Sequence, residues 1–359
     1  MQGVMALRTL YLHIGTHKTG SSSLQKFLFE NVEWLLTKGY YYPVEGRYFL
    51  PMERSQSLLA HSLRGERPNY IRAEVEYSKR QCVAELIADI ESSSAPAVII
   101  SSEHFCPCDR VTLIELQQIL EPLFDQIKIV VYLRRQDQRL ESGYNQRVKT
   151  GACVDSFNKI ATRILHDNKP HMIDYYSMLE SYADIFGKPN IIVRPFEKEQ
   201  LAGGSVIDDF LAILDVQSDS SVVRSTELNR SISTEMLVLI RTLVTGLPEP
   251  QRKKLSMLLR RLPLQTDNKR YTLCSPQMRS RILASSADSN SKVAREYLGR
   301  MDGQLYFQRE ENNLPLYPKL PAVLLVQASQ LLWQAGVQNV PKTGVNLHRE
   351  DRSQNSHRE

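Results

Sequence analysis

A short segment near the start of the chain combines the residue types that bind phosphate groups. It follows the apolar run Thr9 to Ile14 and reads Gly15-Thr16-His17-Lys18-Thr19-Gly20-Ser21-Ser22-Ser23. Backbone N–H groups of a glycine-bounded loop converge on an anion, and a helix that begins after the loop adds its positive dipole end. The segment therefore predicts a phosphate-binding loop between a strand and a helix.

The position of the lysine distinguishes this loop from that of ordinary ATPases and GTPases. Gly15 and Gly20 have the spacing of a Walker A motif, but Ser21 stands at the lysine position and Lys18 lies inside the loop. A Walker lysine contacts the β and γ phosphates, and the next hydroxyl binds magnesium. A lysine placed earlier reaches other oxygens, which argues against an ordinary ATPase or GTPase.

A second group of candidate phosphate ligands follows the apolar run Ile127 to Leu133. Arg134 ends this run, and Ser142 lies eight residues further on in a segment with helical spacing. A guanidinium binds two phosphate oxygens at once, and a hydroxyl on the next helix supplies another donor. The alternative is that Arg134 and Arg135 are solvated charges at a strand end.

Glu103 and His104 are candidates for a general base. They follow the apolar run Ala97 to Ile100 after two serines. Ligands in open α/β sheets bind at the carboxyl ends of the strands, so both side chains are expected at the edge that holds the phosphate loop. The alternative is a helix-end carboxylate and a loop side chain. His13 and His17 are weaker candidates, the first inside a strand and the second shaping the loop.

These segments resemble the nucleotide site of sulfotransferases that use 3′-phosphoadenosine 5′-phosphosulfate (PAPS). Residues 18–22 are similar to the loop with which that family holds the 5′-phosphosulfate, and Arg134 and Ser142 have the interval of its 3′-phosphate ligands. The resemblance implies PAPS as donor, 3′-phosphoadenosine 5′-phosphate as product, and no metal. It implies that Lys18 contacts the bridging oxygen of the leaving group. Glu103 is preferred to His104 as the base because glycan sulfotransferases commonly use glutamate. The residues that it assigns to the nucleotide are Lys18, Thr19, Gly20, Ser21, Ser22, Ser23, Arg134 and Ser142.

The resemblance covers about residues 8 to 310, and its first two motifs are the specific ones. Softer matches lie at Val206 to Leu211, Asn229 to Ser231, Asn290, and Tyr297 to Gly299. In cytosolic aryl sulfotransferases an Arg-Lys-Gly element completes the 3′-phosphate site. This element is not recognisable here, so the residues that would form this third side of the site are not assigned.

Strands and helices alternate through about the first 200 residues, which predicts a parallel sheet covered on both faces. The runs expected to form strands are Thr9–Ile14, Tyr40–Tyr42, Ala97–Ile100, Ile127–Leu133 and Asn190–Val193. The segments expected to form helices are Ser22–Leu36, Val83–Ile90, Val111–Leu120, Val206–Leu214, Ser233–Leu243 and Arg252–Arg261. With the resemblance, this pattern predicts a P-loop-NTPase-like α/β fold. We expect one domain over residues 1–336, with a nucleotide-binding core at about 8–215, a helical part at about 216–336 and a disordered tail at 337–359.

The composition is that of a globular protein with a modest positive charge. The 359 residues carry a net charge of +5, which suits an anionic ligand but is too low for a dedicated nucleic-acid binder. Five scattered cysteines are typical of reduced thiols, and no apolar run has the length of a membrane span. We expect a cytoplasmic protein without stable membrane insertion; its oligomeric state is left open.

The sequence thus favours transfer of a sulfuryl group from PAPS to a hydroxyl or amine. The expected acceptor is a carbohydrate, a lipid-linked precursor or a small molecule. One alternative is a P-loop kinase that uses ATP and magnesium, with Glu103 as its Walker B acid. Another is a non-catalytic binder of 3′-phosphoadenosine nucleotides, which would keep both phosphate motifs and lack a working base.

Overall fold

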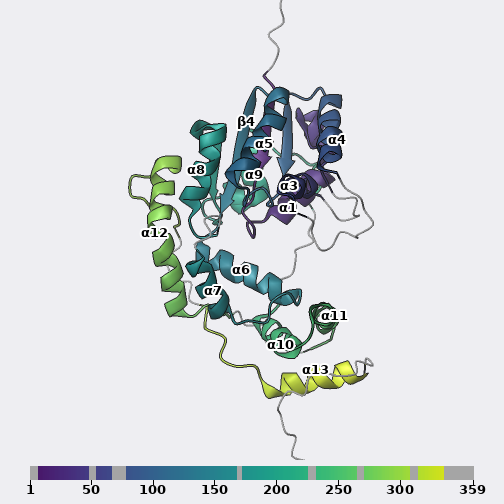
Figure 1. The fold of residues 1–359 in the computed structure, drawn as a ribbon, viewed down its shortest axis with the longest axis vertical. Helices are drawn as coiled ribbons and strands as arrows, with labels where there is room; N and C mark the ends of the chain where they lie inside the picture. The colour runs from purple at the N-terminus through teal and green to yellow at the C-terminus, as the bar shows by residue number, and fades with distance from the viewer. Residues whose placement is uncertain are drawn as a thin grey trace, which may run out of the picture. The chain divides into compact units, whose positions relative to one another are not determined.

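A sheet of five parallel strands forms the centre of the larger of two compact units, and β4 is labelled in it in Figure 1. The computed structural model describes residues 7–47, 54–66, 78–167, 172–224, 232–264, 271–307 and 314–334. The strands are β1 (Thr9–His13), β2 (Tyr40–Tyr41), β3 (Ala97–Ser101), β4 (Gln126–Leu133) and β5 (Ile191–Pro195). They pair in the order β2-β3-β1-β4-β5. The predicted strands and the α/β fold class are confirmed.

Helices cover both faces of this sheet. Leu10 and Leu12 of β1 face one hydrophobic core, and Tyr11 between them faces the other. The first core includes α3 (Ser57–Leu63), α4 (Lys79–Ser92), α5 (Arg110–Leu120), α8 (Tyr175–Phe186) and α12 (Pro276–Leu298). The second includes α1 (Ser21–Glu30), α2 (Val32–Thr37) and α9 (Val206–Ile213). Burial on both faces explains why the strands read as continuous apolar runs.

Further helices lie along the chain after β4. They are α6 (Gln136–Lys149), α7 (Phe157–His166), α10 (Thr234–Val244), α11 (Glu249–Leu259) and α13 (Ala322–Gln334). Single 3₁₀ turns span Glu121–Leu123, Lys188–Asn190 and Ala202–Gly204. The predicted cap of α10 is present, because the Ser233 side chain accepts a hydrogen bond from the Met236 N–H at 3.2 Å.

One predicted helix is divided in two. The spacing of Ser22 to Leu36 predicts a continuous helix, but the structure breaks it at Asn31 between α1 and α2. The Asn31 amide donates to the Phe27 carbonyl at 2.8 Å and to the Val223 carbonyl at 3.0 Å, and its oxygen accepts from the Val223 N–H at 2.7 Å. Contacts with a distant segment thus accompany the end of α1. The spacing of apolar residues within this segment does not predict them.

The chain divides into two compact units, each assembled from separate segments. The first unit comprises residues 1–143, 157–229 and 274–313, and the second comprises 144–156, 230–273 and 314–359. This division differs from the boundary expected near residue 215, because α12 packs against α8 and belongs to the first unit. The predicted tail at 337–359 and the segment Asn229 to Ser231 lie outside the described residues.

The structure also bears on membrane association. Among the described residues, no helix has both the length and the apolar character that a membrane crossing requires.

Candidate functional site

The loop after β1 has the backbone geometry of an anion-binding turn. Gly15, Lys18 and Gly20 adopt left-handed conformations, with φ of +91°, +70° and +80°. Gly20 is the N-cap of α1, and none of the described side chains caps this helix end. The Ser23 and Leu24 N–H groups donate to the Gly20 carbonyl at 2.9 and 3.0 Å, so the N–H groups of Ser21 and Ser22 are the ones left for a ligand, and the helix dipole favours an anion there.

Strand β4 holds the loop in place. Both the N–H and the hydroxyl of Thr16 donate to the Tyr132 carbonyl, at 2.9 and 3.1 Å, and the Tyr132 N–H donates to the Gly15 carbonyl at 2.6 Å. The Thr19 hydroxyl donates to the Thr16 carbonyl at 2.5 Å. Because this uses its one hydroxyl hydrogen, Thr19 offers an anion only its backbone N–H.

The serines at the start of α1 differ in exposure. Ser21 is buried, and its hydroxyl lies 3.5 Å from the Thr16 carbonyl. Ser22 and Ser23 are exposed in the first turn of the helix. Of the three serine hydroxyls in this turn that are predicted to contact the nucleotide, those of Ser22 and Ser23 are thus open to a ligand.

Arg134 brings the second predicted motif to the loop. Its Nη1 donates to the Lys18 carbonyl at 3.0 Å, across 116 residues of sequence. The guanidinium carbon lies 5.9 Å from the centroid of the Phe196 ring, and the Tyr175 hydroxyl donates to the Arg134 carbonyl at 2.6 Å. Burial lowers the pKa of Arg134, although a guanidinium keeps its charge in proteins. A half-buried cation therefore lies beside the phosphate loop.

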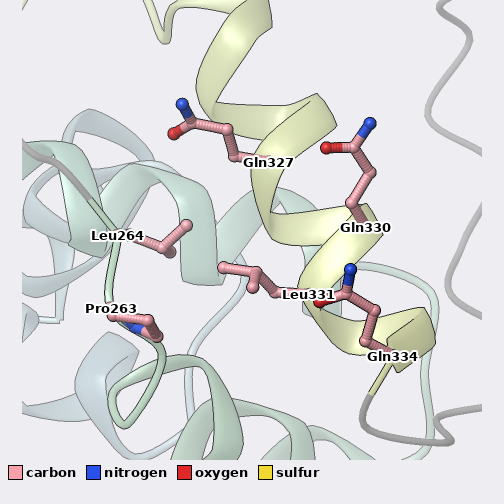
Figure 2. A pocket seen from close by; sticks show the side chains of 6 residues that line it. All are labelled: Pro263, Leu264, Gln327, Gln330, Leu331 and Gln334. Carbon is pink, nitrogen blue, oxygen red and sulfur yellow. The ribbon is translucent and has the colours of Figure 1, made fainter.

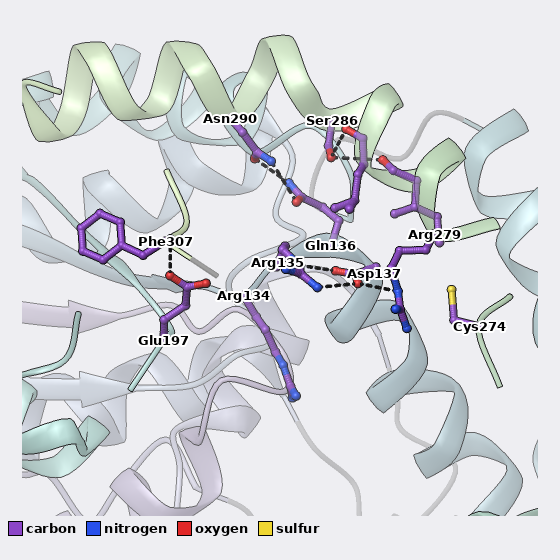
Figure 3. Close-up of polar contacts among 12 residues, drawn as sticks. Arg134, Arg135, Gln136, Asp137, Glu197, Cys274, Arg279, Ser286, Asn290 and Phe307 are labelled. Carbon is purple, nitrogen blue, oxygen red and sulfur yellow. Dashed lines mark hydrogen bonds and ion pairs between the residues drawn. The ribbon is translucent and has the colours of Figure 1, made fainter. Parts of the chain in front are cut away.

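Arg135 is used differently from its neighbour. Its Nε and Nη2 donate to the two oxygens of Asp137 at 2.8 and 3.0 Å, and Arg279 Nε lies 3.3 Å from the same carboxylate. Figure 3 shows this buried group and shows Arg134 pointing away from it. All three side chains are nearly inaccessible. Arg135 is thus part of a buried ion-pair network, and the alternative of a solvated strand-end charge is wrong for it.

Ser142 lies in α6 and is half-buried. Its hydroxyl makes no hydrogen bond with another described residue, so none connects it to Arg134 or to the loop. Its predicted contact with a 3′-phosphate stays a prediction.

Glu103 lies directly against the phosphate loop. A Cβ atom at Gly15 would come within 2.8 Å of the Glu103 Cβ, so only glycine fits this approach. Gln25 of α1 donates from Nε2 to Glu103 Oε2 at 2.8 Å. Burial alone would raise the pKa of Glu103, but the charge of His17 and the Gln25 hydrogen bond outweigh it and hold this pKa below its ordinary value. The carboxylate is therefore ionised at neutral pH and able to accept a proton.

Three imidazole rings gather beside this carboxylate. The His104 ring centroid lies 5.3 Å from that of His17 and 4.2 Å from that of His61. His61 Nδ1 lies 3.2 Å from Glu66 Oε2. Burial, and then the neighbouring His104, lower the pKa of His61 to about 4, so this ring is neutral at pH 7. The predicted bases Glu103 and His104 thus lie in one polar cluster next to the loop.

His13 has a structural role. Its ring is fully buried in β1 and lies 2.7 Å from the Ser101 hydroxyl through Nδ1. Burial lowers its pKa to about 4, against the opposing effect of Glu103. A neutral, enclosed histidine of this kind supports the packing of β1 on β3.

Two residues of the cluster were missed by sequence reasoning. Gln25 lies one helical turn after Ser21, and the 3.6-residue period could have placed it on the face of α1 that carries the loop serines. His61 lies in α3, which precedes β3 by more than thirty residues. The approach of His61 to His104 has no sequence signal, because it depends on how α3 packs.

Arg134 and Arg135 form a matched pair for testing the second motif. Arg134→Ala is expected to weaken binding of 3′-phosphorylated adenosine nucleotides by about 1.5–3 kcal/mol, the usual value of a charge-assisted contact. Nucleotides without the 3′-phosphate should change little. Arg135→Ala should instead destabilise the fold by about 3 kcal/mol, because it leaves Asp137 buried with fewer partners. Calorimetric titration and thermal unfolding measure the two effects. An equal loss for both kinds of nucleotide would assign Arg134 to another phosphate or to the fold.

Comparisons with known proteins give likenesses to a curated protein and to a solved structure, among others. No model of a known protein family matches the chain. A protein of Archaeoglobus fulgidus described as uncharacterized is 30% identical over 227 residues, which make up 61% of this chain and 60% of that relative's length. The crystal structure of a sulfotransferase from Alicyclobacillus acidocaldarius aligns with 71% of this chain and 97% of its own, at 19% identity and a TM-score of 0.41. Neither likeness assigns an activity to this chain.

Proposed function

We propose that this protein transfers a sulfuryl group from PAPS to a hydroxyl or amine of an acceptor, which would be a carbohydrate, a lipid-linked precursor or a small molecule. The observation that supports this most is the hydrogen bond from Arg134 to the Lys18 carbonyl. Two candidate anion-binding segments, far apart in sequence, thereby lie at one place. A donor with phosphates at both its 5′ and 3′ positions requires two such segments.

The residues around the loop fit such a donor. The uncapped start of α1 and the left-handed turn at Gly20 would hold the 5′-phosphosulfate, together with the hydroxyls of Ser22 and Ser23. Arg134 pairs with no carboxylate among the described residues, and its charge would face the 3′-phosphate. The Lys18 side chain would place its charge beside the phosphate that leaves. PAPS itself would supply a sulfuryl group attached to that phosphate.

Transfer then requires a base on the acceptor side of the site. As the acceptor oxygen or nitrogen bonds to sulfur, the bond from sulfur to the bridging oxygen breaks, and the acceptor proton must go to a protein group. Glu103 is ionised, lies against Gly15 and is held by Gln25, which suits it for this role. His104 is the alternative base in the same cluster. Backbone N–H groups and Lys18 would stabilise the charge that develops on the leaving phosphate.

Nucleotide preference tests the proposal. We expect 3′-phosphoadenosine 5′-phosphate to raise the melting temperature in the presence of a chelator, because a ligand that binds only the folded state stabilises it. ATP with magnesium should raise it much less. Differential scanning fluorimetry and calorimetric titration measure both. The reverse preference would support the kinase alternative. The position of Glu103 just after β3 is compatible with a Walker B acid in such a kinase. Tight nucleotide binding without turnover on any acceptor in a labelled-PAPS screen would support the non-catalytic binder.

A further inference from the structure

The two compact units carry opposite net charge. The second unit, residues 144–156, 230–273 and 314–359, has 16 Lys and Arg against 7 Asp and Glu, a net charge of +9. The rest of the chain has 29 against 33, a net charge of −4, and the two together give the overall +5. The modest total therefore conceals a strongly basic unit that is separate from the nucleotide-binding loop. Such asymmetry points to an anionic partner.

Four of these 16 basic residues are exposed on α11 or directly after it. Leu255 and Leu259 are buried and fix the orientation of the helix. At 100° per residue the opposite face carries basic side chains, continued by the two arginines that follow the helix. The exposed basic residues are Lys253, Lys254, Arg260 and Arg261. Glu249 is the acidic residue of α11 and pairs with Lys253 at 2.7 Å.

The basic face continues onto the end of α6. The Ser256 hydroxyl donates to the Lys149 carbonyl at 2.6 Å, and a Cβ at Gly151 would lie 2.7 Å from the Arg252 carbonyl oxygen. These close backbone approaches bring the last turn of α6, with exposed Arg147, against α11. A further exposed basic residue thus lies on a segment that packs against α11, about a hundred residues away in sequence.

The same unit exposes large apolar side chains. Trp333 and Val323, both on α13, are 78% and 63% exposed. Met257 of α11 and Leu314 and Leu316 before α13 are also exposed. Helix α13 contains no charged residue, and Leu324, Ala328 and Leu332 form its buried side. The outward side of α13 therefore consists of aliphatic, amide and aromatic side chains. Such an uncharged surface is unusual for a helix that faces water.

Helix α13 lies close to the basic end of α11. Gln327, Gln330, Leu331 and Gln334 of α13 line a groove together with Pro263 and Leu264 (Figure 2). The volume of this groove is about 260 Å³. Pro263 comes two residues after Arg261, and Trp333 precedes Gln334. The neutral groove thus has arginines near one wall and an exposed tryptophan near the other.

We propose that the second unit binds the surface of an anionic lipid bilayer, through the basic face of α11 and the outward side of α13. Basic side chains are attracted to anionic headgroups, and Trp, Val and Leu enter the boundary between headgroups and acyl chains. A nucleic acid or an anionic polysaccharide would use the charge but would leave the uncharged side of α13 without a role. The binding is peripheral and requires neither the nucleotide nor an acceptor, so it stands apart from the proposed transfer.

Vesicle binding by the full chain tests this proposal. We expect cosedimentation with phosphatidylcholine vesicles that contain about one third phosphatidylglycerol, and at least about tenfold weaker binding to phosphatidylcholine alone. Added salt should weaken the binding, because it screens the headgroup charge. The chain has two tryptophans, and Trp34 is buried. A blue shift of emission on binding should therefore come from Trp333 and should disappear in Trp333→Phe.

Charge-reversal variants supply the matched comparison. Lys254→Glu combined with Arg261→Glu should reduce vesicle affinity about tenfold or more. Lys159→Glu combined with Arg163→Glu reverses two exposed charges on α7 of the first unit and should leave the affinity unchanged. Unchanged melting temperatures show that both variants are folded. Equal affinity for both vesicle types, no binding to either, or equal losses for the two double variants would overturn the proposal. Tighter binding to RNA or heparin than to the anionic vesicles, without a shift of Trp333 emission, would also overturn it.

Discussion

Replacing Lys18 by alanine is expected to lower kcat by about a hundredfold or more, equivalent to about 2.7 kcal/mol of transition-state stabilisation. The charge on the leaving phosphate is largest in the transition state, so a lysine beside it contributes more to turnover than to ground-state binding. Affinity for 3′-phosphoadenosine 5′-phosphate should fall less than about tenfold. Lysine and alanine both carry a Cβ atom, so the left-handed backbone at this position (φ +70°) is equally strained in both.

Steady-state kinetics and calorimetric titration of the same preparation separate these effects. Lys26→Ala is the matched control, because Lys26 lies on α1 beyond the loop and pairs with Glu30 at 3.6 Å. It should leave both kcat and nucleotide affinity near their original values. Equal losses of turnover and of binding in Lys18→Ala would make Lys18 a ground-state ligand and would contradict its role at the leaving group.

Glu103→Gln is expected to remove most of the turnover and to leave nucleotide binding intact. The substitution keeps the shape of the side chain and removes the group that accepts the acceptor's proton. His104→Ala distinguishes the two candidate bases, since it should retain most of the activity if Glu103 is the base. Turnover on an identified acceptor and titration with 3′-phosphoadenosine 5′-phosphate are the measurements. Near-normal turnover in both variants would show that the base has been misplaced.

The pH profile gives an independent test of the base. A carboxylate acts as a base only when it is ionised, so activity should be lost as the pH falls through the Glu103 pKa. Gln25→Leu removes a hydrogen bond that favours the ionised form, which raises this pKa. The acid limb of the kcat/KM profile should therefore move to higher pH, while nucleotide affinity stays the same. If the acid limb does not move in a variant with an unchanged melting temperature, then Gln25 does not set the pKa of the catalytic base.

Local patterns in the sequence were sufficient for the sheet and for the loop. A short apolar run bounded by turn residues is typical of a strand buried on both faces, and a glycine-bounded loop followed by serines is typical of a phosphate-binding turn. Strand β4 then fixes that loop through the hydrogen bonds between Tyr132 and residues Gly15 and Thr16. The approach of Arg134 to Lys18 could be anticipated because parallel strands end at one edge of the sheet. The different contacts of Arg134 and Arg135 could not be anticipated, because Arg135 is held by Asp137, which also lies close to the distant Arg279.

Tertiary packing decided the surroundings of the base and the grouping of the helices. Gln25 contacts Glu103, and His61 contacts His104, because α1 and α3 pack on opposite faces of the sheet beside β3. Such contacts join residues tens of positions apart, and their side chains carry no periodic signal. For the same reason the net charge of +5 read as modest, although it is the sum of +9 in one compact unit and −4 in the rest of the chain. Composition sums charge along the chain, whereas a partner meets only the charge that folding places on one surface.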